Sequence, residues 1–246
     1  MSSDSVIRLA TDRDIDDVHA WLKQEKQLGV HGNFLCNWNV ILHHHRDQRV
    51  HVYVERDTPV AFVAGGLTRD GILQVRDAQR GRGVGKALVQ HALRACVAAG
   101  RSIVVIECAP TTSIPFWRKM GFVAADENQD VDGSHYAYLI LEMRHELPAE
   151  GKPVDVVIRF FPDQRLRNTS VKPLSTHSPR AVEAADGEVH LSERIAFANL
   201  TYARDVVVEI VVDQRPLYLE KAKREAGAKL GIVRCDDGFI VDKLHI

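Results

Sequence analysis

Glycines alternate with basic residues in the stretch Gln79-Arg80-Gly81-Arg82-Gly83-Val84-Gly85-Lys86, which lies between a short apolar run and a helical pattern. A glycine-rich turn between a strand and a helix points several backbone N–H groups and the positive end of the helix dipole at one spot. Glycine has no Cβ atom, so a phosphate group can approach the main chain closely. The stretch therefore predicts binding of a phosphorylated ligand.

The spacing of these glycines excludes two common nucleotide-binding loops. A Walker A loop has a glycine five positions before its Gly-Lys pair and Ser or Thr directly after it, whereas this chain has Arg80 and Ala87 there. A dinucleotide fingerprint, Gly-x-Gly-x-x-Gly, needs a third glycine where this chain has Lys86 or Leu88. The pattern that does fit is Arg-x-x-Gly-x-Gly.

Two further segments occur with this pattern. Residues 116–122 read Phe-Trp-Arg-Lys-Met-Gly-Phe, which predicts a helix ended by glycine and followed by a strand. Residues 6–15 predict a short strand, a polar capping turn and the start of a helix. Together the three features resemble the GNAT superfamily of N-acetyltransferases, over roughly residues 5–147. The resemblance does not extend to the rest of the chain.

The elements that would position these residues follow from periodicity. Helical spacing predicts helices over residues 14–28, 33–47, 84–99 and 111–120. Apolar and β-branched runs predict strands over residues 50–55, 60–67, 72–75, 102–108, near 122 and over 135–143. This order matches the α/β (α+β) GNAT fold, a mixed and mostly antiparallel sheet flanked by helices.

A second domain is predicted beyond a linker at residues 148–153, which contains two prolines and a glycine. The first domain, residues 1–147, is the acetyltransferase-like one, and residues 154–246 form a small α+β domain of unidentified function. In the second domain we expect strands over 154–161, 205–212 and 239–244, an irregular loop over 165–187, and a helix over 216–231.

The resemblance implies that acetyl-coenzyme A is the cosubstrate. The backbone N–H groups of residues 80–85 would hold its pyrophosphate, while Arg82 and Lys86 would either contact phosphate or remain solvated. The main chain of the strand that ends near Val75 would pair with the pantetheine arm. The predicted cofactor-binding residues are Leu73, Val75, Arg80, Gly81, Arg82, Gly83, Val84, Gly85, Lys86 and Trp117.

Acetyl transfer to an amine needs a base and a proton for the departing thiolate. Glu107 is a lone carboxylate at the end of an apolar strand, where burial would raise its pKa, and it is our predicted base. A structural carboxylate that caps a helix or pairs with an arginine is the alternative. Trp117 stands where related enzymes carry a tyrosine acid, so Ser113, Tyr136 or a water would donate the proton, or the thiolate would leave unassisted.

Several other residues have two interpretations. The run His43-His44-His45 predicts a polar helical face and no metal site, because adjacent helical residues point about 100° apart. His19 and His31 would be either exposed or in contact with the acceptor. The aromatic residues of this region would form either the core or a wall of the acceptor site; these are Trp21, Phe34 and Trp38.

Composition limits the remaining function classes. The 32 basic and 33 acidic residues balance, so no nucleic-acid or membrane partner is expected. Residues 1–4 lack the features of a signal peptide. The four cysteines have no Cys-x-x-Cys spacing and are interpreted as buried apolar side chains in a reducing compartment. These features predict a cytoplasmic protein.

Three hypotheses follow. The first is an N-acetyltransferase that transfers acetyl directly to a small-molecule or protein amine in a ternary complex. The second is a non-catalytic acyl-coenzyme A sensor whose C-terminal domain engages a partner. The third gives the C-terminal domain its own activity, or makes it the interface of a homodimer.

Overall fold

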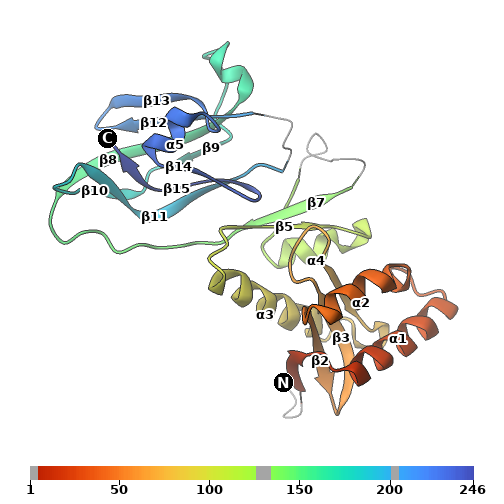
Figure 1. Ribbon diagram of the computed structural model, residues 1–246. Coiled ribbons are helices and arrows are strands. Elements are labelled where there is room, and N and C mark those ends of the chain that lie inside the picture. The colour runs from red at the N-terminus through yellow and green to blue at the C-terminus, as the bar shows by residue number, and fades with distance from the viewer. Residues whose placement is uncertain (1–4, 126–133, 201–204) are drawn as a thin grey trace. The chain divides into compact units, whose positions relative to one another are not determined.

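The computed structural model describes residues 5–125, 134–200 and 205–246 (Figure 1). Contacts divide the chain into two compact units, Met1–Leu139 and Ile140–Ile246. Each unit has a hydrophobic core of its own, so each is described by itself.

Unit 1 contains two antiparallel sheets. The first has the order β1-β2-β3-β4, with bounds Ser5–Leu9, Val50–Glu55, Thr58–Ala64 and Ile72–Val75. The second has the order β5-β7-β6, with bounds Ile103–Glu107, Tyr136–Ile140 and Val123–Ala124. The hairpin between β2 and β3 turns through Arg56 and Asp57, which have φ values of 47° and 61°. Positive φ at both central residues is the geometry of a type I′ turn, whose twist matches that of the strands.

Helices cover both faces of the first sheet (Figure 1). α1 (Asp12–Gln27) and α2 (Trp38–Arg46) pack on the face that carries Val52 and Phe62. α3 (Val84–Ala98) packs on the opposite face, against Tyr53 and Val63. Successive strand residues point to opposite faces, so one apolar run supplies both cores. A short helix, α4 (Ile114–Lys119), follows β5.

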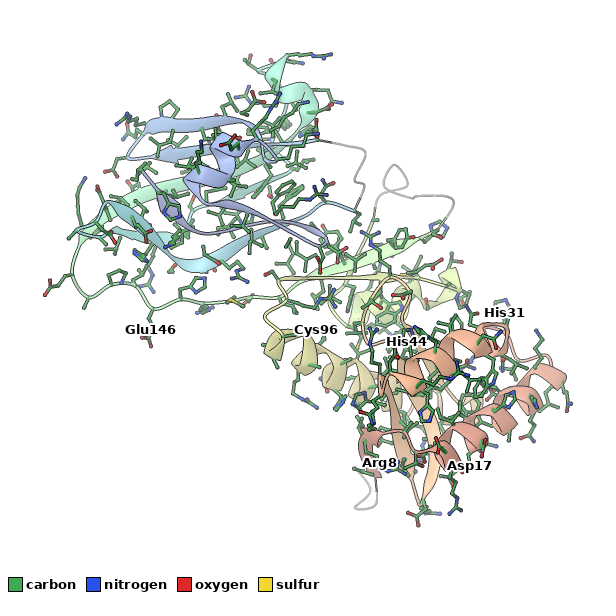
Figure 2. The ribbon with its side chains drawn as sticks, in the orientation of Figure 1. Arg8, Asp17, His31, His44, Cys96 and Glu146 are labelled. Atoms are coloured by element: carbon green, nitrogen blue, oxygen red, sulfur yellow. The ribbon has the colours of Figure 1, made fainter. Side chains whose placement is uncertain are left out.

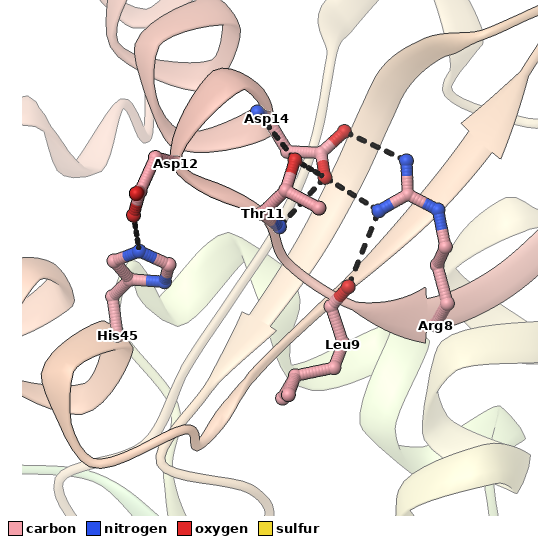
Figure 3. A network of polar contacts seen from close by, with 6 residues as sticks. All are labelled: Arg8, Leu9, Thr11, Asp12, Asp14 and His45. Carbon is pink, nitrogen blue, oxygen red and sulfur yellow. Dashed lines mark hydrogen bonds and ion pairs between the residues drawn. The ribbon is translucent and has the colours of Figure 1, made fainter.

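A capping box fixes the start of α1 (Figure 3). Asp14 accepts hydrogen bonds from the Thr11 backbone N–H at 2.8 Å and from Arg8 Nη2 at 3.0 Å. The Asp14 N–H in turn donates to the Thr11 hydroxyl. Burial alone would raise the pKa of Asp14, but the hydrogen bonds from Arg8 and Thr11 outweigh it and lower the pKa.

His44, on α2 (Figure 2), is a buried histidine whose two ring nitrogens have no hydrogen-bond partner in the described chain. Its ring packs against Gly65, where an added Cβ would lie 2.6 Å from Nε2. Burial, followed by the nearby Arg49, lowers the pKa of His44 below its ordinary value of 6.5. The imidazole is therefore neutral in the folded protein at pH 7.

We expect unit 1 to lose stability as the pH falls below about 6.5, because the unfolded chain then takes up a proton that buried His44 resists. Above that pH the contribution is fully present. The urea midpoint at pH 7 and pH 5, followed by tryptophan fluorescence, should show the loss, and His44→Leu should reduce it. His43→Leu is the control, since that side chain is 68% exposed. An equal pH dependence in all three proteins would contradict the assignment.

Unit 2 is built on one eight-stranded sheet with the order β13-β12-β8-β10-β11-β15-β14 and with β9 paired to β8. In chain order from β8 to β15, the bounds are Lys152–Pro162, Ser175–His177, Arg180–Glu183, Glu188–Ala198, Val206–Val212, Arg215–Lys221, Ile232–Cys235 and Gly238–His245. A short helix, α5 (Glu225–Leu230), lies between β13 and β14. The apolar residues of the strands form its core; the largest include Ile158, Phe160, Leu191, Ile210 and Leu244.

Two predictions for unit 2 are wrong. Residues 165–187 are not one irregular loop, because they contain β9 and β10, which are too short and polar to show alternation. The helix predicted over 216–231 shrinks to α5, because Asp213 and Gln214 adopt positive φ and turn the chain into β13. Pro216 begins no helix; it lies on an edge strand, where its missing N–H costs no ladder hydrogen bond. β8 also starts within the segment interpreted as a linker.

No helix in the described residues is both long enough and apolar enough to cross a membrane.

Candidate active site

A cavity of about 710 Å³ opens in unit 1. β4 is the last strand of the first sheet and β5 the first strand of the second, and both contribute lining residues. The remaining walls come from the segment after α1, the glycine stretch and α4. The lining includes His31, Phe34, Leu73, Gln74, Val75, Arg80, Gly81, Gly83, Gly85, Lys86, Glu107, Pro110, Ser113, Phe116, Trp117 and Lys119.

The glycine stretch forms one end of this cavity and leads into α3. Gly81 and Gly83 have φ values of 77° and 86°, and an added Cβ at either would have no neighbour within 4 Å. Gly83 is the N-cap of α3 and offers no capping side chain. Consequently, the backbone N–H groups of residues 81–86 have no acceptor within the described chain. Unpaired N–H groups at the start of a 15-residue helix form an anion site.

The three basic side chains of the stretch have different surroundings. Arg80 lines the cavity and pairs with Asp77 at 3.2 Å. Arg82 donates to Gln79 and lies 3.6 Å from Glu55, so its side chain does not line the cavity. Lys86 lines the cavity and has no ion-pair partner among the described residues. Lys86 is therefore the cation best placed to meet an anionic ligand.

Packing places the apolar residues that the sequence singled out. Leu73 and Val75 line the cavity from β4, whereas Val84 is buried and contributes only its backbone. An added Cβ at Gly85 would lie 3.3 Å from Phe116, so glycine permits the close approach of α3 and α4. Trp117 is buried in edge-on contact with Phe116, at a centroid distance of 5.1 Å, and also lines the cavity.

Glu107 and Ser113 both line the cavity, but one prediction about them is wrong. Glu107 is exposed rather than buried, because β5 ends there and its side chain faces the opening. Its Oε1 accepts a hydrogen bond from the Ser134 hydroxyl at 2.9 Å. The Ser113 Oγ atom is buried and has no hydrogen-bond partner in the described chain, so it is available to a ligand. Tyr136, the alternative donor, lies under Arg69 and outside the lining.

Residues 46–124 match the family model described as an acetyltransferase (GNAT) domain, the segment that contains the glycine stretch, Glu107 and Trp117. The likeness to a GNAT domain covers this segment of the chain. The segment beyond residue 124, including all of unit 2, is outside that match. The prediction made from the three sequence signatures is confirmed.

The comparison with solved structures covers a little more than half of this chain. Ard1 from Thermoplasma volcanium is 23% identical and has a TM-score of 0.43, with 56% of this chain and 97% of that one covered. A ribosomal-protein-alanine N-acetyltransferase from Brucella melitensis is 19% identical with a TM-score of 0.43, with 55% and 99% covered. An N-acetylglutamate synthase from Neisseria gonorrhoeae, complexed with coenzyme A and N-acetyl-glutamate, is 18% identical with a TM-score of 0.44; 59% of this chain and 36% of that one are covered. A search of curated proteins found no match.

Some histidines of unit 1 line the cavity and others pack elsewhere in the unit. His31, in the segment after α1 (Figure 2), lines the cavity. His19 instead stacks on Trp38 at a centroid distance of 4.0 Å. The run of three histidines does not converge: His43 pairs with Asp47, His45 pairs with Asp12 (Figure 3), and His44 is buried.

The aromatic residues divide in the same way. Trp21 belongs to the core, whereas Phe34 lines the cavity. Trp38 packs against the core through α2.

Sequence reasoning missed two polar residues beside the cavity of unit 1. Gln74 is the only polar residue of β4 and is 3% exposed, and that break in an apolar strand was a readable signal. Glu25 is 6% exposed on α1. Its neighbours in sequence are polar, so nothing in the pattern separates it from a solvated helix face.

Proposed function

We propose that this chain transfers the acetyl group of acetyl-coenzyme A directly to an amine of a small molecule or a protein. One observation carries the proposal. The unpaired N–H groups of residues 81–86 open on the same cavity as a carboxylate, Glu107, and an unpartnered hydroxyl, Ser113. An anion site therefore shares a cavity with two groups able to move protons.

The residues of the cavity fit acetyl-coenzyme A, which supplies the acetyl group as an activated thioester. The N–H groups of residues 81–86 and the Lys86 ammonium group suit a pyrophosphate. The open edge of β4 offers main-chain hydrogen bonds beside Leu73 and Val75. Phe34, Phe116 and Trp117 supply apolar walls. Arg80 adds positive charge at the same end, while Arg82 and Val84 contribute only backbone.

In the proposed reaction, the amine nitrogen forms a bond to the acetyl carbon and the bond from that carbon to sulfur breaks. Glu107 takes the proton that the amine loses. Because its carboxylate is exposed, it can also return that proton to solvent. The Ser113 hydroxyl donates a hydrogen bond to the sulfur as negative charge develops there.

Direct transfer is favoured over an acetyl-cysteine intermediate. Cys108, next to Glu107, is 2% exposed. Burial, with a smaller contribution from the Glu107 charge, raises the pKa of its thiol to about 11. The nucleophile of cysteine chemistry is the thiolate, and at pH 7 this side chain is a thiol. Cys36 is exposed but does not line the cavity.

We expect the protein to release free thiol from acetyl-coenzyme A in step with an N-acetylated product when it is offered a panel of amines. Thiol release is followed with a chromogenic disulfide, and the product is identified by mass spectrometry. A reaction without amine measures hydrolysis and is the control. Coenzyme A that binds without acetylation of any amine or of lysate proteins would overturn the proposal, as would hydrolysis alone.

A further inference from the structure

Glu25 is a buried carboxylate whose described partners are two neutral donors. Its Oε1 accepts the backbone N–H of Asp77 at 2.7 Å, and its Oε2 accepts Gln74 Nε2 at 3.4 Å. Gln74 is also buried, and its Oε1 accepts the backbone N–H of Phe34 at 2.9 Å. These four residues form one continuous chain of hydrogen bonds.

This series of hydrogen bonds joins two walls of the cavity. At one end, Phe34 follows His31 and Gly32, and all three line the cavity. At the other end, Asp77 begins the 3₁₀ turn Asp77–Gln79, which leads directly into the glycine stretch. The segment after α1 has one more polar tie, since Asn33 Nδ2 donates to the Leu22 carbonyl at 3.0 Å. The Glu25–Gln74 pair therefore connects the anion end of the cavity to the part of the lining that contains Phe34.

The order of donors and acceptors in this series of hydrogen bonds allows only certain side chains at positions 25 and 74. Both outer donors are backbone N–H groups, so both outer positions need an acceptor atom. An amide has one acceptor and one donor end, whereas a carboxylate has two acceptors. One amide and one carboxylate therefore satisfy all three hydrogen bonds, but two amides or two carboxylates do not. An unsatisfied buried group is destabilising.

We infer that Glu25 and Gln74 are positioning residues. They fix the position of the 3₁₀ turn before the glycine stretch relative to Phe34, on the cavity wall. This inference rests on the proposed function, because the relative position of the turn and Phe34 matters for the ligand that the glycine stretch binds. Neither residue is assigned a role in moving protons. Glu25 does not line the cavity and reaches it only through Gln74 and Asp77.

The donor–acceptor logic provides a reciprocal test. Glu25→Gln places two amides face to face, and Gln74→Glu places two carboxylates face to face. The double variant, Glu25→Gln with Gln74→Glu, restores one amide and one carboxylate, so each outer N–H again finds an acceptor. The three variants are compared with the parent at a temperature where all are folded.

Two measurements are made on each protein: amide hydrogen exchange at Phe34 and Asp77, and calorimetric titration with coenzyme A. Each single variant should lose at least one hydrogen bond, which should speed exchange at one or both amides about fivefold and weaken coenzyme A binding by a similar factor. The double variant should recover the slow exchange and most of the affinity. Asp14→Asn is the control, because it disrupts a buried carboxylate network at the far end of the same helix (Figure 3).

Unchanged exchange in the single variants would overturn the inference, and so would a double variant that is no better than either single one. An equal loss of coenzyme A affinity in Asp14→Asn would show that the weaker binding of the single variants comes from general destabilisation, and it would also overturn the inference. Failure of the parent to bind coenzyme A would count against the proposed function. Hydrogen exchange would still decide whether Glu25 and Gln74 hold the two segments together.

Discussion

Gly83→Val is expected to weaken coenzyme A binding at least about 100-fold while leaving unit 1 folded. Gly83 is the N-cap of α3 with a φ of 86°, a conformation that a β-branched residue rarely adopts. The added side chain meets no protein atom within 4 Å at its Cβ, and Gly83 lines the cavity, so we expect the side chain to occupy space that the ligand needs. Two hydrogen bonds from N–H groups to a charged ligand contribute about 3 kcal/mol or more, which corresponds to the stated factor. Calorimetric titration with coenzyme A measures it.

Gly100→Val separates the loss of the site from backbone strain. Gly100 follows the other end of α3, has a φ of 69°, and also has no neighbour within 4 Å of an added Cβ. Both substitutions impose a similar strain of about 1–2 kcal/mol and should lower the melting temperature by similar amounts. Only the change at Gly83 should abolish binding. Retained affinity for coenzyme A in Gly83→Val would refute the assignment of the glycine stretch as the anion site. An equal loss of affinity in Gly100→Val would show that backbone strain causes the weaker binding.

The parts of the fold that were predictable are those with a strong local signal. β2 and β4 were predicted with the bounds that the structure has, because each is a short apolar or β-branched run with turn residues close by. The prediction for α3 differs by one residue at its end, where Gly100 follows the apolar stripe. These elements also surround the glycine stretch, so its setting between strand and helix could be read from the sequence.

The features that could not be predicted depend on contacts between distant residues. β13 resembled the start of a helix because it contains a proline, and only its place at the sheet edge explains why a proline fits there. The exposure of Glu107 depends on where β5 ends relative to the cavity. The hydrogen bond from Asp77 to Glu25 joins residues 52 positions apart, a separation that periodicity does not register.

The second large effect is expected at Glu107, where replacement by glutamine should reduce the acetylation rate by about 100-fold or more. The amide keeps an oxygen that can accept the hydrogen bond from Ser134, so the local structure should persist. It has no group that takes a proton from the amine. Affinity for coenzyme A should remain within about twofold of the parent, because the glycine stretch is unchanged. The acid limb of the pH profile of kcat/KM, which the proposal assigns to Glu107, should disappear in the variant.

Ser134→Ala is the matched control for Glu107→Gln. It removes the hydrogen bond to the carboxylate and leaves the carboxylate in place. If Glu107 is the base, this variant should keep most of the rate and retain the acid limb, because the carboxylate that takes the proton is still present. Two results would exclude Glu107 as the base: a glutamine variant with the parent's pH profile, or equal rate losses in the two variants. The proton would then leave the amine through water in the open cavity, and the chain would act mainly by holding the two substrates together.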